Sequence, residues 1–136
     1  MSSKRIEPDT PGTSPLSAAG RFFFYWLPLI GLCGAIFWQS SFPSVHDTNW
    51  FLHQDKGLHL AAYGLMAFLA ARALDRERPG LRRSTLWLLA SAFAVLFGLS
   101  DEIHQSFVPG RTASIADWIA DILGSAAGAW IFIRRR

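Results

Sequence analysis

Long stretches of the chain are apolar on nearly every side, and polar residues gather at their ends. The apolar segments cover residues 22–38, 57–74, 86–100 and 118–133. A helix needs about 20 residues to cross the hydrocarbon core of a bilayer, so the shorter segments reach across only with their polar ends. In a soluble protein all of them would be buried, and 136 residues leave too little chain to cover them. The pattern predicts an all-α polytopic membrane protein, with four transmembrane helices in one bundle.

The distribution of lysine and arginine indicates how this bundle is oriented. The sections before, between and after the apolar segments carry 3, 1, 5, 1 and 3 of these residues in chain order, if Arg72 at the end of the second segment is counted with the loop that follows it. Because cationic loops stay in the cytoplasm, both termini are predicted inside, and the loops after the first and third segments outside. The net charge of +3 therefore reflects topology. The sequence has no cluster of basic residues with aromatic residues between them, so it does not indicate nucleic-acid binding.

The chain divides into an arm and one membrane domain. Residues 1–20 are rich in Ser, Pro and Gly and have no apolar period, which predicts a disordered cytoplasmic arm. Residues 21–136 form the predicted four-helix domain. Its first segment is longer than the apolar stretch of a signal peptide, so we interpret it as a permanent anchor. The single cysteine, Cys33, excludes an intrachain disulfide.

The outer ends of the last three segments carry polar residues at helical spacing. These residues share a helix face with small residues, which predicts that they point into the bundle. Exposing a carboxylate to lipid costs about 2.5–3.5 kcal/mol or more, and this cost favours the same placement. One candidate site is therefore expected at the outer end of the bundle. Its members are Asp55, Lys56, His59, Tyr63, Asp101, Glu102, His104, Gln105, Arg111, Asp117 and Asp121.

Some of the polar residues also have a plainer structural interpretation. Ser114 with Asp117 three residues later is typical of a helix N-cap with an acidic partner. Asp101 either joins the site or faces the lipid headgroups. His46 and His53 fall in the first outer loop, where solvent is expected. The GxxxG motif at residues 124–128 lets a second helix approach closely, either within the chain or in a dimer, so the oligomeric state stays open.

Polar blocks in the last three segments resemble the VanZ-like family of small bacterial integral membrane proteins, over about residues 55–128. The resemblance implies a multi-pass protein of the bacterial inner (cytoplasmic) membrane. It also implies a link to low-level resistance to the lipoglycopeptide teicoplanin, which the family's namesake confers. One departure is Asp121, where the family pattern has Asn. The blocks read Asp55-Lys56-x-x-His59-x-x-x-Tyr63, Glu102-x-x-Gln105-x-x-x-Pro109-Gly110-Arg111 and Asp117-x-x-x-Asp121-x-x-Gly124-x-x-x-Gly128.

The leading hypothesis is a pocket that binds or acts on cell-envelope or lipid-linked material and lowers susceptibility to teicoplanin-type lipoglycopeptides. In a hydrolase or transferase, His59 and Glu102 would be the catalytic base and acid. The sequence has no G-x-S-x-G motif and no Pro-Ser-Gly-His signature, so whether there is turnover stays open. The predicted binding residues are Asp55, Lys56, Tyr63, Gln105, Arg111, Asp117 and Asp121.

Two further functions fit the same residues. Three pairs offer two ligand-type residues each: Asp55/His59 and Asp117/Asp121 at i,i+4 spacing, and Glu102/His104. Such oxygen-rich sets favour Mg²⁺, Mn²⁺ or Ca²⁺. With so many polar residues in the segment ends, a set of possible metal ligands is found easily by chance. The sequence therefore assigns no residue as a metal ligand and names no cofactor. The other alternative is a non-catalytic structural or partner-binding protein, in which polar contacts of about 0.6 kcal/mol each hold the helices together.

Overall fold

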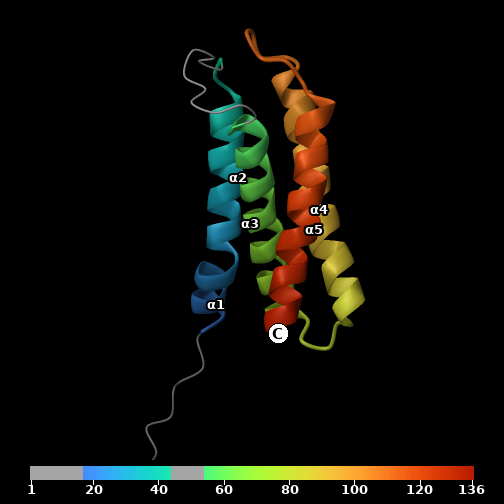
Figure 1. The fold of residues 1–136 in the computed structure, drawn as a ribbon. Coiled ribbons are helices and arrows are strands. Elements are labelled where there is room, and N and C mark those ends of the chain that lie inside the picture. Colours follow the sequence, from blue (N-terminus) through green and yellow to red (C-terminus); the bar gives the residue numbers. More distant parts are fainter. Residues whose placement is uncertain (1–16, 44–53) are drawn as a thin grey trace, which may run out of the picture.

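The computed structural model describes residues 17–43 and 54–136, which form five helices and no strands (Figure 1). Helices α2 to α5 run alternately along one axis, so one end of the bundle holds the ends of α2 and α4 and the starts of α3 and α5. We call this end the pocket end, and the opposite end the arginine end. The helices are α1 (Ala18–Tyr25), α2 (Leu27–Ser40), α3 (Gln54–Glu77), α4 (Arg83–Gln105) and α5 (Ile115–Arg135).

The last three helices form the body of the bundle. Helix α3 packs most extensively on α5, and α4 packs on both, while α1 and α2 lie along α3 on the other side (Figure 1). Tyr63, Met66 and Leu86 are the largest apolar side chains in the core, and alanines fill most of the remaining positions. A core built of such small side chains lets the helix axes approach closely.

The helices are long enough, and apolar enough outside, to lie in a bilayer. Each of α3, α4 and α5 is a candidate membrane span, and the bent pair of α1 and α2 makes a fourth if it crosses as one. The 23 residues of α4 extend about 35 Å, against a hydrocarbon core of about 30 Å. Large apolar side chains such as Leu88, Leu96 and Leu123 point outward, where lipid can cover them.

The first apolar segment is broken, whereas the sequence predicted one helix over residues 22–38. Helices α1 and α2 meet at Trp26 with a bend of 44°. Pro28 lies in the first turn of α2 and has no N–H to donate to the carbonyl of Phe24, so the α-helical ladder is interrupted there. Helix α1 also begins at Ala18, inside the stretch assigned to the arm, and residues 1–16 lie outside the described part of the chain.

The GxxxG motif is used within the chain. An alanine Cβ at Gly124 would overlap the carbonyl of Leu60, and one at Gly128 would overlap the carbonyl of Gly64. Both carbonyls belong to the backbone of α3, which therefore lies directly on the glycine face of α5. Of the two uses that the sequence left open, close packing between helices of one chain is the one seen here.

Candidate functional site

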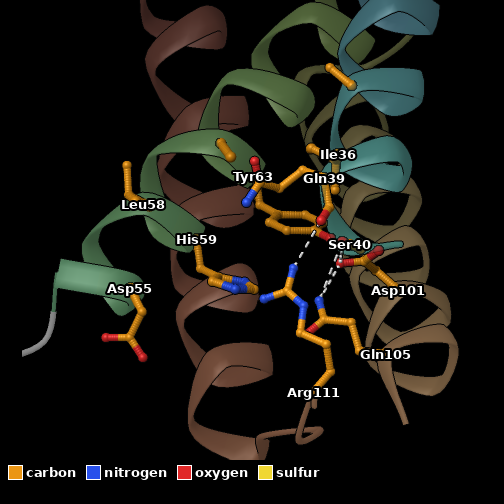
Figure 2. A pocket seen from close by; sticks show the side chains of 12 residues that line it. Ile36, Gln39, Ser40, Asp55, Leu58, His59, Tyr63, Asp101, Gln105 and Arg111 are labelled. Atoms are coloured by element: carbon orange, nitrogen blue, oxygen red, sulfur yellow. Dashed lines mark hydrogen bonds between the residues drawn. The ribbon is translucent and has the colours of Figure 1, made fainter. Parts of the chain in front are cut away.

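A pocket of about 420 Å³ opens between α2, α3 and α4 at the pocket end (Figure 2). One part of its wall is aliphatic and belongs to α2 and α3, whereas the other part carries charged and amide side chains. The pocket thus offers an apolar wall and a polar end to the same ligand. Its lining residues are Ala35, Ile36, Gln39, Ser40, Asp55, Leu58, His59, Ala62, Tyr63, Asp101, Gln105 and Arg111.

A buried polar contact joins α2 to α4 beside this pocket. The Ser40 hydroxyl donates to Asp101 Oδ2 at 2.8 Å, and Gln105 Nε2 donates to the same oxygen at 2.8 Å. All three side chains are buried, and Asp101 is only 4% exposed. Asp101 therefore joins the site and does not face the headgroups. Together these groups hold the end of α2 over the pocket.

Replacing Ser40 with alanine is expected to loosen this end of α2. The change removes a buried hydroxyl that donates a hydrogen bond to Asp101. We therefore expect a loss of about 1–3 kcal/mol in the free energy of unfolding. Unfolding of the purified protein in mild detergent measures the loss. The matched control is Ser106→Ala, because the exposed Ser106 hydroxyl bonds only the Ile103 carbonyl of its own helix. Equal losses for both variants would contradict the prediction.

His59 and Asp121 form the central pair of the site. Nδ1 of His59 lies 2.9 Å from Asp121 Oδ1, across the interface between α3 and α5. The ring of Tyr63 stacks parallel to the imidazole, with centroids 6.0 Å apart, and this fixes the plane of the imidazole. Space for the carboxylate comes from Gly98 on α4, where a Cβ would lie 2.7 Å from Asp121 Oδ2. Residues of all three body helices thus build one contact.

Glu102 connects α4 to the start of α5. Its Oε2 accepts a hydrogen bond from the backbone N–H of Ser114 at 2.7 Å. Ser114 is the N-cap of α5, and its hydroxyl accepts from the N–H of Asp117, which confirms the predicted cap. Oε1 of Glu102 is buried and has no hydrogen-bond partner among the described residues. The carboxylate therefore keeps one oxygen for another ligand.

Charged residues at the rim neutralise one another. Lys56 Nζ lies 3.1 Å from Asp117 and 3.3 Å from Asp55.

Arg111 lies in the turn between α4 and α5, directly after Gly110. Gly110 has a φ of 80°, which glycine adopts without strain. Nη2 of Arg111 donates a hydrogen bond to the Gln39 carbonyl at 3.2 Å. Figure 2 shows the Arg111 side chain reaching back into the pocket. Its Nε is buried with no hydrogen-bond partner among the described residues, so this guanidinium keeps a donor inside the pocket.

The structure brings the predicted site residues to one end, but not all to one surface. His59, Tyr63, Gln105 and Arg111 line the pocket with Asp55. Glu102 and Asp121 lie behind this wall within the bundle, and Lys56 and Asp117 pair at the rim.

Some residues fall outside this arrangement, and others were missed. His104 stacks on Phe37 and forms a hydrogen bond with Ser41, and it is not among the residues that line the pocket. His46 and His53 lie outside the described residues. Sequence reasoning missed Ser40, because a serine at the end of an apolar helix gives no periodic signal.

The family model named VanZ/LLP1 matches residues 22–136. The chain belongs to this family. Membership covers the bent first helical pair, which precedes the region of about 55–128 that carries the sequence resemblance. No curated protein and no solved structure matches the chain. This VanZ-like chain is thus a membrane-protein family member with three or four candidate spans, and its pocket lies within the matched region.

Proposed function

We propose that this VanZ-like protein lies in the bacterial inner membrane and binds or acts on cell-envelope or lipid-linked material at the outer leaflet. It thereby lowers susceptibility to teicoplanin-type lipoglycopeptides. The supporting observation is the pocket, in which the Arg111 guanidinium shares one space with the aliphatic side chains of Ile36 and Leu58. A ligand with an anionic headgroup and an apolar tail matches both parts of this wall.

The distribution of arginine supports an outward-facing pocket. Among the described residues, the connection between α3 and α4 with Arg78 and Arg82 lies at the arginine end, together with α1 and the C-terminus (Figure 1). Arg72 stacks there on Phe24, and Arg134 stacks on Trp130. If the arginine end faces the cytoplasm by the positive-inside rule, the pocket end faces the periplasm or the cell exterior.

Among the cations of the site, Arg111 is the one suited to an anionic ligand. Lys56 already shares its charge with two carboxylates at 3.1 and 3.3 Å. Arg111 makes a hydrogen bond to a neutral carbonyl, and no carboxylate forms a salt bridge with it among the described residues. An unneutralised guanidinium beside an apolar wall favours a phosphate or carboxylate group of an amphipathic ligand.

A hydrolase or transferase is the second candidate function, and the His59–Asp121 contact favours it. A carboxylate bonded to one imidazole nitrogen orients the ring and leaves the other nitrogen to exchange a proton with substrate. Asp121 then positions His59, the catalytic base, and Glu102 is the acid. Cys33 is not among the residues that line the pocket, so no thiol nucleophile is assigned in this scheme.

The test compares teicoplanin susceptibility of cells that express the wild-type protein, Arg111→Gln, Glu102→Gln or the control Glu77→Gln. Glu77 lies at the arginine end of α3, far from the pocket. Membrane abundance is recorded in the same cultures. Loss of a charge-assisted hydrogen bond costs about 1.5–3 kcal/mol, so Arg111→Gln should weaken ligand binding about 10- to 100-fold and remove most of the protection.

The outcomes separate the functions. Protection that is lost in Arg111→Gln and in Glu102→Gln at wild-type abundance, and kept in the control, supports the proposal. If protection follows abundance alone, the polar cluster is structural. If the wild-type protein gives no protection, the link to lipoglycopeptides is wrong for this chain.

A further inference from the structure

The pocket end buries more negative charge than its cations balance. Asp121 is fully buried, Asp101 is 4% exposed and Glu102 is 6% exposed. Among the described residues, no lysine or arginine forms a salt bridge with any of them, and His59, the partner of Asp121, balances that charge only when it is protonated. A buried carboxylate without a counter-charge is costly, so some other positive charge is expected here.

Two of these carboxylates each keep a free oxygen. Asp121 Oδ2 and Glu102 Oε1 are buried and accept no hydrogen bond from the described residues. In both side chains the second oxygen is bonded, to His59 and to the Ser114 N–H respectively. The two side chains are therefore held in place by one oxygen while the other stays available. Such an arrangement is typical of carboxylates that ligate an ion.

The two carboxylates and one imidazole also face one another. Ligand atoms of His59, Glu102 and Asp121 all lie within 4.8 Å of one another. Ligands bound at about 2.1 Å in tetrahedral geometry lie about 3.4 Å apart, so a pair at the 4.8 Å limit would have to approach by about 1.4 Å, through rotation of the side chains, when the ion binds. The three residues come from α3, α4 and α5, which makes the geometry a product of the whole body of the bundle.

We propose that His59, Glu102 and Asp121 bind one divalent cation. This ligand set combines residues differently from the pairs that the sequence suggested, which were Asp55 with His59, Glu102 with His104 and Asp117 with Asp121. One imidazole and two carboxylates suit Zn²⁺ or Mn²⁺ better than Ca²⁺, which prefers six or more oxygen ligands. Its two positive charges balance the Glu102 and Asp121 carboxylates.

The position of the set next to the pocket gives the ion a further ligand site. His59 belongs both to the cluster and to the pocket wall, so an ion bound to it lies at the pocket boundary. Three protein ligands with an open fourth position are typical of ions that also contact a substrate or water. The binding of the ion itself does not depend on the proposed envelope function and can be measured on the purified protein alone.

The experiment measures Mn²⁺ and Zn²⁺ binding to the full chain, purified in mild detergent and stripped with EDTA. We expect one equivalent of bound metal, measured by elemental analysis after desalting and by Mn²⁺ electron paramagnetic resonance. Pulsed electron paramagnetic resonance of the Mn²⁺-loaded wild-type protein should detect coupling to one histidine nitrogen. Because this measurement uses the wild-type protein, it does not depend on whether a substituted protein folds. Binding that is absent, or that shows no nitrogen coupling, would overturn the proposal in favour of carboxyls neutralised by protons.

Variants then assign the ligands. Glu102→Gln and Asp121→Asn should each weaken Mn²⁺ affinity more than tenfold, because even groups outside the ligand set change metal affinity about 10- to 100-fold. The matched control is Asp75→Asn, a carboxylate paired with Arg136 at the arginine end, which should bind as the wild type does. Unchanged affinity in both ligand variants would place the ion elsewhere and contradict the assignment.

Discussion

Replacing Gly128 with alanine is expected to cost the protein most of its stability. The added Cβ would overlap the carbonyl of Gly64, and because that atom belongs to the α3 backbone, no side chain can move aside. Helices α3 and α5 would have to separate along their closest contact. Overpacking of a core costs about 1–3 kcal/mol, and we expect the upper end of this range or more here. Thermal unfolding in mild detergent measures the change.

The matched control for this prediction is Gly31→Ala. Gly31 lies in α2, and a Cβ there has nothing within 4 Å. Alanine is also a better helix former than glycine by about 0.8–1 kcal/mol, so the control should be as stable as the wild type or slightly more stable. If Gly128→Ala and Gly31→Ala unfold at the same temperature, the close packing of α3 on α5 is not what stabilises the bundle.

The change of His59 to phenylalanine is expected to have the second large effect. Asp121 is fully buried and His59 is its hydrogen-bond partner, so phenylalanine leaves one carboxylate with no donor. Leaving a buried acceptor without its hydrogen-bond donor costs about 1–3 kcal/mol, and more for a charged group, because the remaining carboxylate stays desolvated. We therefore expect a lower unfolding temperature and less protein in the membrane.

A second substitution separates stability from function. In the double variant His59→Phe with Asp121→Leu, no charge is left unpaired, and most of the lost stability and abundance should return. Protection against teicoplanin should not return, because the polar pair is still missing. A double variant as unstable as His59→Phe alone would contradict the pairing, and one that regains protection would contradict a functional role for this pair.

The close packing of α3 on α5 connects these predictions to the site. The glycine face of α5 lies directly on the backbone of α3, and His59 and Asp121 face each other one turn further along the same interface. This packing brings together two side chains that are 62 positions apart in the chain. A change at Gly128 should therefore disturb the site as well as the fold.

The sequence by itself determined which segments are helices. Apolar runs too long and too uniform for a soluble core predicted α3, α4 and α5. The turn and cap residues Gly110 and Ser114 predicted where α5 begins, because their chemistry is local. The same reasoning placed Glu102 and Asp121 inside the bundle, since they share helix faces with small residues. Each of these conclusions depends on neighbours within a few residues along the chain.

Only the tertiary structure decided which polar groups meet. Spacing paired His59 with Asp55 on one helix, whereas the fold pairs His59 with Asp121 and Lys56 with Asp117 across α3 and α5. These partners depend on the rotation and separation of two packed helices, which no local pattern encodes. The role of Ser40 had the same origin, because its hydroxyl bonds Asp101 on α4, 61 positions further along the chain. Pairings across helices are set by packing, and packing is a property of the whole chain.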